Sequence, residues 1–336
     1  MRPSVLIVDD SAFARTMLSR MLQRSHRIDV VGTACDGLDA LERIAELDPD
    51  VVTLDLMMPQ LDGLGVLRAL AGRPRPRVIV VSISSVDTEL GAEALALGAI
   101  DLVAKPTALA SDRLQEIEAA LTARILAIAG TAAAAVVPPA RGPALRPARG
   151  RELIVLGTST GGPQALTRLV AALPAGLAVP LLIALHIPAG YTEALAQRLD
   201  RLSPLRVVEA SDGLELTPGL VVLARGGSHL RVARLPGGLR AEVSPLPVAA
   251  HVPSVDELFV SAARAVGAGC LGIVLTGMGD DGLIGARAIA AAGGALITEA
   301  AATCVVYGMP RAVHEAGLGA VAVPLHHLID EIAHHV

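Results

Sequence analysis

Residues 153–162 read LIVLGTSTGG, and this stretch predicts the fold of the second half of the chain. The aliphatic run 153–156 is typical of a short buried parallel strand. It breaks at Gly157 into a turn that carries Ser159 and ends in two glycines, before a helical segment with Pro163 in its first turn. Residues 157–161 match the G-x-S-x-G nucleophile elbow, in which small neighbours expose a serine at the end of a strand. Ser159 is therefore a candidate nucleophile in an α/β domain.

The composition of the 336 residues excludes several classes of function. Apolar residues make up 52% and aromatic residues 1%, so we expect aliphatic cores and no aromatic platform for nucleic-acid bases. A net charge of −5 also provides no basic surface for nucleic acid. Cys35, Cys270 and Cys304 lie far apart without metal-ligand spacing, which favours reduced thiols in the cytoplasm and no zinc site. No apolar run reaches transmembrane length, so no membrane insertion is expected.

The first half alternates apolar strands with helical segments. The strands are expected near 4–8, 28–34, 51–56, 77–82 and 101–106, which is the pattern of a doubly wound parallel sheet with its site at the strand carboxyl ends. Polar residues stand at those ends: Asp9, Asp10, Asp55, Ser82 and Lys105. Clustered carboxylates repel one another unless a hard divalent cation lies between them, so the pattern predicts Mg²⁺. Asp55 would then attack a phosphoryl group, with Lys105 and the metal neutralising the added charge.

Each of these residues alone is more simply a helix cap or a solvated charge, but their occurrence on successive strands favours a site. The segments VDDS, VVTLDLMMPQLDG, VVS and AKP resemble the receiver domain of two-component response regulators over residues 1 to about 125. The resemblance implies a flavodoxin-like fold with strand order 2-1-3-4-5 and phosphorylation of Asp55 by a histidine kinase. It also implies Mg²⁺ bound by Asp10, Asp55 and the Met57 carbonyl, with Asp9 in support. Many receivers have an aromatic switch residue where this chain has Leu102, so the coupling to output is expected to differ.

The composition changes abruptly after a helix expected near 111–128. Residues 129–150 are rich in Ala, Pro, Gly and Arg without a sustained apolar period, which is typical of an extended linker. We therefore divide the chain into a receiver domain at 1–125, a flexible linker at 126–151 and a catalytic domain at 152–336. The arginines of the linker could contact an acidic partner, although solubility of an exposed tether is the simpler explanation.

In the second half, polar residues again follow buried strands. His186 ends the strand PLLIAL, and Asp280 and Asp281 follow LGIVLTGMG, so both sites are expected to share a crevice with Ser159. A serine needs a neighbouring base, which an imidazole provides, and a carboxylate can fix the tautomer of that imidazole. The loop at 277–279 offers backbone N–H groups for an oxyanion hole. Four shorter segments, RVVEA, GLVVLA, HLRVARL and LRAEVS, are expected as antiparallel additions.

Simpler interpretations remain open for each of these residues. The TSTGG turn could be a capped helix start or an anion cradle, His186 a half-buried structural histidine and Asp281 a turn residue. The chain order Ser, His, Asp differs from that of α/β-hydrolases, so that analogy fails. Other histidines compete as the base, although none follows so clear a buried strand: His229, His251, His314, His326, His327, His334 and His335.

The segments GTSTGG, HIPAGYT, PSVDELF, VLTGMGDDG and CVVYGMP resemble the catalytic domain of chemotaxis protein-glutamate methylesterases, the CheB family. The resemblance implies a doubly wound, mostly parallel α/β domain with Ser159, His186 and Asp281 as the catalytic triad. It places Met278 and Thr160 in support of the oxyanion, and Asp280 where relatives often have Asn.

The resemblance further implies that Ser159 attacks methylated glutamates on the cytoplasmic helices of chemoreceptors, releasing methanol, and that glutamines can be deamidated. We expect a monomer whose receiver domain covers the crevice until Asp55 is phosphorylated. Two other functions remain as alternatives. One is a nucleotide- or phosphate-binding module, although the chain lacks G-x-G-x-x-G and a Walker lysine. The other is a non-catalytic response regulator whose second domain only binds a partner.

Overall fold

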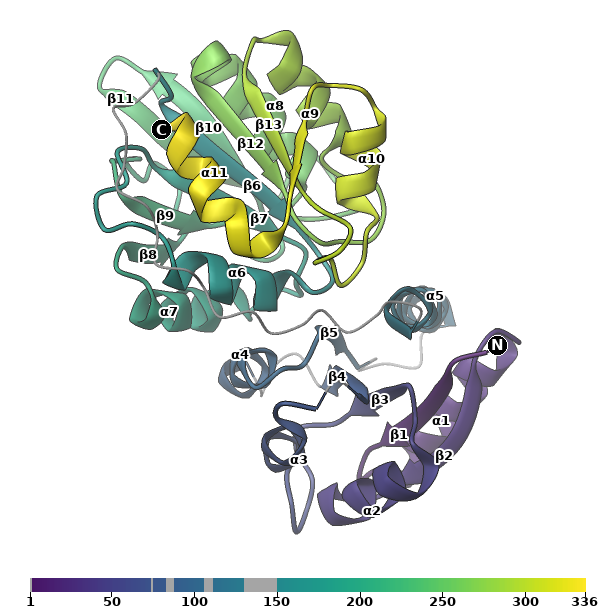
Figure 1. The fold of residues 1–336 in the computed structure, drawn as a ribbon. Helices are drawn as coiled ribbons and strands as arrows, with labels where there is room; N and C mark the ends of the chain where they lie inside the picture. Colours follow the sequence, from purple (N-terminus) through teal and green to yellow (C-terminus); the bar gives the residue numbers. More distant parts are fainter. Residues whose placement is uncertain (1, 74, 83–87, 106–110, 130–149) are drawn as a thin grey trace. The chain divides into compact units, whose positions relative to one another are not determined.

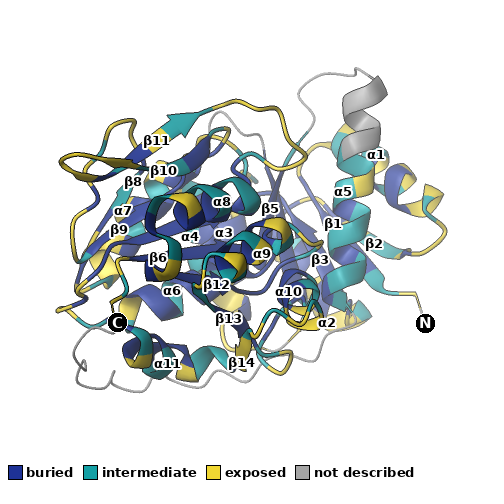
Figure 2. Cartoon of the chain, turned by 90° about the horizontal axis from the view of Figure 1, so that it is seen from above, coloured by how far each residue is buried: buried dark blue, intermediate teal, exposed yellow. Residues whose placement is uncertain are grey.

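The computed structural model describes residues 2–73, 75–82, 88–105, 111–129 and 150–336, without the side chains of 111–116. The chain forms two compact units, Met1–Ala133 and Ala134–Val336. Figure 1 shows their helices and strands, and Figure 2 shows that the strands are largely buried while exposed residues gather on loops and outer helix faces. Among the described helices, none is long and apolar enough to cross a membrane.

The first unit is a five-stranded parallel sheet in the predicted order, β2-β1-β3-β4-β5. Helices α1 and α5 pack together, and α2, α3 and α4 form a second group. The elements are β1 Ser4–Val8, α1 Ala12–Arg24, β2 Asp29–Ala34, α2 Gly37–Leu47, β3 Val51–Leu54, α3 Gly63–Leu70, β4 Arg77–Ser82, α4 Thr88–Ala96, β5 Asp101–Ala104 and α5 Ser111–Ala129.

Helix α5 reaches Ala129, so residues 126–129 are helical and not part of a linker beginning at 126. Ile128 within this segment is fully buried, as is Ile125 just before it, so the buried face of the helix extends to its end. Most of the expected linker, residues 130–149, lies outside the described residues.

The second unit is built on a seven-stranded sheet of order β14-β13-β12-β6-β7-β9-β8, in which every pair of neighbours is parallel. The sheet elements and their helices are β6 Leu153–Thr158, α6 Gly162–Ala171, β7 Leu181–Leu185, α7 Thr192–Leu202, β8 Arg206–Glu209, β9 Leu220–Leu223, α8 Val255–Val266, β12 Cys270–Val274, α9 Leu283–Ala291, β13 Ala295–Glu299, α10 Met309–Glu315, β14 Val321–Val323 and α11 Leu328–His335. Figure 1 shows α6, α7 and α11 on one face of this sheet and α8 and α9 on the other.

The prediction of four antiparallel additions is half wrong. Strands β8 and β9, the segments RVVEA and GLVVLA, are parallel members of the main sheet. Only β10 His229–Leu235 and β11 Gly238–Ser244 form an antiparallel hairpin. Parallel neighbours normally need a helical crossover, but β8 and β9 are joined by residues 210–219 without a helix, which is why the sequence pattern misled.

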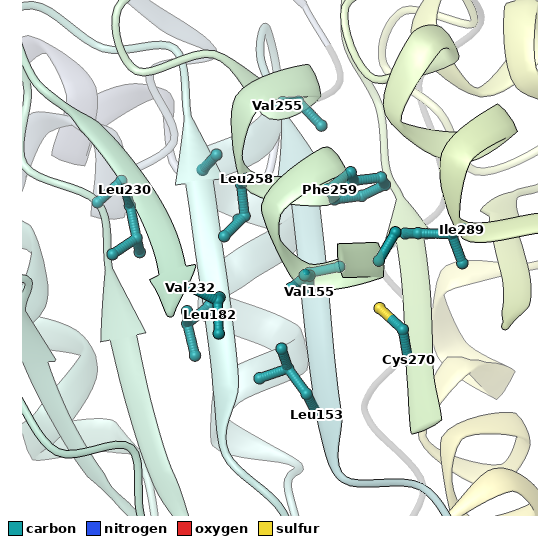
Figure 3. Close-up of a cluster of buried hydrophobic side chains, with 14 of the residues drawn as sticks. Leu153, Val155, Leu182, Leu230, Val232, Val255, Leu258, Phe259, Cys270 and Ile289 are labelled. Atoms are coloured by element: carbon teal, nitrogen blue, oxygen red, sulfur yellow. The ribbon is translucent and has the colours of Figure 1, made fainter. Parts of the chain in front are cut away.

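The core of the second unit lies where α8 packs on the sheet. Figure 3 shows Leu258 and Phe259 of α8 among Val155, Leu182 and Ile289. Leu230 and Val232 of β10 belong to the same buried cluster, so the hairpin is tied to α8 through apolar contacts. This packing holds the start of α8 and the start of β10 near the carboxyl ends of the central strands.

Candidate functional site

Ser159 lies directly beyond β6, at the centre of the sheet. Its backbone N–H donates to the Thr276 carbonyl (3.1 Å), beyond β12, and only 7% of Ser159 is exposed. The turn then requires a left-handed residue before α6, and Gly161 provides it with φ +81°. Gly157 is needed for a close approach, because a Cβ there would lie 2.2 Å from Cγ1 of Val255, at the start of α8. The local fold predicted from LIVLGTSTGG is therefore the one observed.

His186 occupies the equivalent position on the neighbouring strand β7. Its backbone N–H donates to the Thr158 carbonyl (3.2 Å), which continues the parallel register that pairs Thr158 with Leu185. Ser159 and His186 are therefore next to each other at the carboxyl edge of the sheet. The ring Nε2 of His186 lies 2.8 Å from Oδ2 of Asp281, while Nδ1 is buried without a hydrogen-bond partner among the described residues.

Asp281 lies in the loop between β12 and α9 and accepts bonds from the start of α8. The N–H groups of Val255 and Asp256 donate to its carboxylate at 2.8 and 3.0 Å, and Ser254 Oγ donates at 3.0 Å. Burial alone would raise the pKa of Asp281, but the bond to His186 and these N–H groups hold it well below its usual range. Asp281 therefore stays ionised and is oriented on His186.

The helix starts of α8 and α9 cap each other. Asp281 precedes α9 and binds the first N–H groups of α8, whereas Asp256 of α8 accepts from the N–H groups of Gly282 and Gly285 at 2.9 and 2.7 Å. Ser254 and Asp256 were not among the residues predicted for the site. A signal was available, because Ser254 and Glu257 have the spacing of a capping box, and Ser254 Oγ does accept from Glu257 N–H.

Within the described part of the chain, His251 is the competing histidine that contacts His186. Its ring stacks on that of His186 with centroids 4.1 Å apart and 13° between the planes. His229 is buried and is hydrogen-bonded to Pro247 and Ser254, in the loop between β11 and α8. His327 and His335 pair instead with Asp330 and Glu331 of the C-terminal helix. Asp280, the alternative acid, is exposed.

The loop predicted to bind an oxyanion lies against Ser159. A Cβ on Gly277 would lie 3.0 Å from Ser159 Cβ and 2.3 Å from Sδ of Met309, so a larger residue there would crowd Ser159. The carbonyl of Gly277 accepts from the N–H groups of Gly308 and Met309, whereas the Met278 N–H has no partner among the described residues. Thr160 is buried, and its carbonyl accepts from Thr276 Oγ1 (3.0 Å).

In the first unit, the three predicted acids come together. Asp9, Asp10 and Asp55 each have a carboxylate oxygen within 4.8 Å of the others. Lys105 Nζ lies 2.7 Å from Asp9 and 2.5 Å from Asp55. Burial raises the pKa of Asp55, and the nearby Asp9 charge adds to this. The bond to Lys105 acts in the opposite direction, but the pKa of Asp55 stays raised. Three acids with one lysine leave excess negative charge, so the donor set fits a hard divalent cation. Met57, two residues after Asp55, is exposed.

Of the predicted switch residues, Ser82 ends β4, Leu102 lies on β5 and Lys105 follows β5 directly. Ser82 is fully buried at the end of β4, and its carbonyl accepts from Lys105 N–H (2.7 Å). Leu102 is 1% exposed and pairs with Val80 in the register of the two strands. An aliphatic side chain therefore fills the interior at this position.

Comparisons with known proteins identify both units. The CheB methylesterase family matches residues 154–332, and the response regulator receiver domain family matches residues 5–117. A protein-glutamate methylesterase/protein-glutamine glutaminase of Myxococcus xanthus is 54% identical over 339 residues, covering 99% of this chain and 97% of that protein. A protein of the same name from Symbiobacterium thermophilum is 42% identical, covering 98% of this chain and 95% of that protein.

A solved structure agrees with these matches. The CheB methylesterase catalytic domain of Thermotoga maritima aligns with a TM-score of 0.54 at 36% identity, covering 55% of this chain and 99% of that domain. The family resemblance predicted from the motifs is thereby confirmed. The chain belongs to the CheB methylesterase family and carries a response regulator receiver domain before its catalytic domain.

Proposed function

We propose that this chain is a phosphorylation-activated protein-glutamate methylesterase that also deamidates glutamine, acting in the cytoplasm on chemoreceptor helices. The observation that carries the proposal is the bonded His186–Asp281 pair beside Ser159 at the edge of the sheet. The names of the relatives supply the substrate class, a glutamate methyl ester or a glutamine in a protein. We further propose that the chain works as a monomer.

In the proposed reaction, Ser159 Oγ attacks the carbonyl carbon of the ester, and His186 takes the serine proton. Because Nε2 faces Asp281, Nδ1 is the ring nitrogen free to act as the base, and the Nε2–H tautomer is the one that Asp281 stabilises. The positions of the two nitrogens are thus the reverse of those in chymotrypsin. His186 then returns the proton to the leaving methoxide, giving methanol and an acyl-enzyme.

Water hydrolyses the acyl-enzyme with His186 again as the base, releasing free glutamate and restoring Ser159. With glutamine as substrate, the leaving group is ammonia. The N–H of Met278 is the proposed donor to the oxyanion, because its loop lies against Ser159, with Thr160 in support. The ionised Asp281 stabilises the imidazolium formed in each step.

In the receiver domain, Asp55 is the proposed acceptor of a phosphoryl group from a histidine kinase. Asp10, Asp55 and the Met57 carbonyl, with Asp9 in support, would hold Mg²⁺, which neutralises phosphoryl oxygens. Lys105 lies within hydrogen-bond reach of Asp55 and supplies a second positive charge. Ser82, Lys105 and Leu102 are the proposed switch residues that couple phosphorylation to the catalytic domain.

The test uses the full chain and a receptor fragment labelled on its methyl esters. Ser159→Ala should abolish release of labelled methanol, whereas Ser203→Ala, at the end of α7, should leave it unchanged. A serine-directed phosphonate should label Ser159 in the natural chain only. Unchanged methanol release by Ser159→Ala would disprove the proposal, and tight nucleotide binding without labelling would favour an anion-binding module.

A further inference from the structure

The loop between β11 and α8 is fastened at two points to a single buried histidine. His229, at the start of β10, is fully buried. Its Nδ1 accepts from the Ser254 N–H (3.1 Å), and its Nε2 lies 2.8 Å from the Pro247 carbonyl. Since a carbonyl can only accept and an N–H can only donate, His229 is the neutral Nε2–H tautomer.

The same loop brings two side chains to the His186–Asp281 pair. His251 stacks on the ring of His186, and Ser254 Oγ donates to Asp281 Oδ1 (3.0 Å). His251 thus restricts one face of the His186 ring, and Ser254 restricts one oxygen of the Asp281 carboxylate. The loop from 247 to 254 is therefore a support for the base and for the acid that orients it.

Other anchors of this loop also lie on or beside β10. Gly227 N–H donates to the Val252 carbonyl (3.2 Å), and Arg231 donates to the Leu246 carbonyl (2.6 Å). Strand β10 is anchored beside the loop, because Leu230, next to His229, packs in the core beneath α8 (Figure 3). A rigid strand, a loop and the catalytic pair thus form one continuous chain of contacts.

We infer that His229 is a positioning residue for the proposed esterase: by fastening both ends of the 247–254 loop, it sets the orientation of His186 and Asp281. The inference rests on the function proposed above. Without the His229 ring, the Ser254 N–H and the Pro247 carbonyl lose buried partners and the loop can shift. Small displacements of catalytic groups cost up to about a hundredfold in rate. His229 is buried away from solvent, so KM should change little.

The first experiment compares three variants of the full chain on the labelled receptor fragment. His229→Leu removes both bonds, His229→Asn keeps an acceptor near the Nδ1 position, and Val232→Ala weakens the core of the same strand without touching the loop. We expect kcat to fall about ten- to a hundredfold in His229→Leu at unchanged KM, with partial recovery in His229→Asn. Val232→Ala should lower the melting temperature and leave kcat unchanged.

Equal kcat in His229→Leu and the natural chain would overturn the inference. It would also be overturned if Val232→Ala lowered kcat as much as His229→Leu does, because destabilisation alone would then explain the loss. If His229→Leu does not fold, His229→Asn decides, with an intermediate kcat in support and a natural kcat against. Ser159→Ala run alongside separates the two claims: if the natural chain is as inactive as Ser159→Ala, the proposed function fails and not the positioning role.

A second experiment does not depend on activity. The proton between His186 Nε2 and Asp281 should give a low-field ¹H resonance, and His186→Gln identifies it. We expect this signal to broaden or move in His229→Leu and to persist in Val232→Ala. In a double-mutant cycle, His229→Leu should have a smaller effect on kcat once His251→Ala has removed the stacked ring, because one of the two loop contacts is then already lost. An unmoved resonance or additive effects in the cycle would contradict a role exerted through the loop.

Discussion

Asp281 performs two tasks with one carboxylate, since it orients His186 and caps the start of α8. Replacing it with Asn keeps the shape but removes the charge and allows the wrong ring tautomer. By analogy with the equivalent change in a serine protease, kcat should fall about 10⁴-fold. Methanol release under saturating substrate measures this.

The neighbouring acid provides the matched control. Asp280 is exposed, and its backbone carbonyl, not its side chain, accepts from Leu283 N–H. Asp280→Asn should therefore leave kcat within about twofold, in line with the small effects of surface substitutions. If Asp280→Asn lost activity and Asp281→Asn kept it, the assignment of the orienting acid would be wrong.

The lowered pKa of Asp281 also predicts how stability depends on pH. Because the folded pKa lies below the unfolded value of about 3.9, the ionised form favours folding above that value, and the contribution is lost as the pH falls through the folded pKa. The stability difference between the natural chain and Asp281→Asn should thus shrink from pH 5 to pH 2. Denaturant titrations at several pH values measure it, and a constant difference would contradict the prediction.

At the scale of elements, the reciprocal caps make α8 and α9 depend on each other. Asp256→Ala removes the acceptor for the Gly282 and Gly285 N–H groups, and the loss of such a cap costs about 1 kcal/mol. We expect the melting temperature of the catalytic domain to fall by about 2–4 °C. Glu193 is an exposed acid in the first turn of α7 that accepts no backbone N–H among the described residues. Glu193→Ala should therefore change the melting temperature by less than about 1 °C, because surface substitutions usually change stability by only about ±0.5 kcal/mol. A similar shift in both variants would argue against the cap.

The elements also show what the sequence could and could not predict. The strands that precede Asp9, Asp55, Ser159 and His186 were predictable, because apolar runs and turn residues mark them locally. The parallel pairing of β8 and β9 was not, since strand direction depends on distant partners and no helix signals the crossover. The contact of His251 with His186 joins residues 65 positions apart through a loop without periodicity, and only the folded chain reveals it. The same holds for His229 and Ser254.

At the scale of the whole molecule, the proposed phosphoryl acceptor Asp55 and the proposed nucleophile Ser159 belong to different units. Asp55→Asn should therefore abolish phosphoryl transfer from the kinase and the resulting activation, while basal methanol release persists. Asp62→Asn is the control, because Asp62 caps α3 on the same domain through its side chain. Activation by kinase and ATP that survives Asp55→Asn would contradict the account of regulation.

Removal of divalent cations should likewise abolish phosphoryl transfer without affecting basal ester hydrolysis. The receiver site clusters Asp9, Asp10 and Asp55, whose charges exceed that of Lys105, whereas hydrolysis is proposed to use only protein groups around Ser159. A chelator should thus abolish transfer of the phosphoryl group to Asp55, and Mg²⁺ in excess should restore it. Basal methanol release should remain unchanged in the same samples. Loss of basal release that Mg²⁺ restores would show that the catalytic domain itself needs a metal, and phosphoryl transfer that persists in chelator would remove the metal from the receiver.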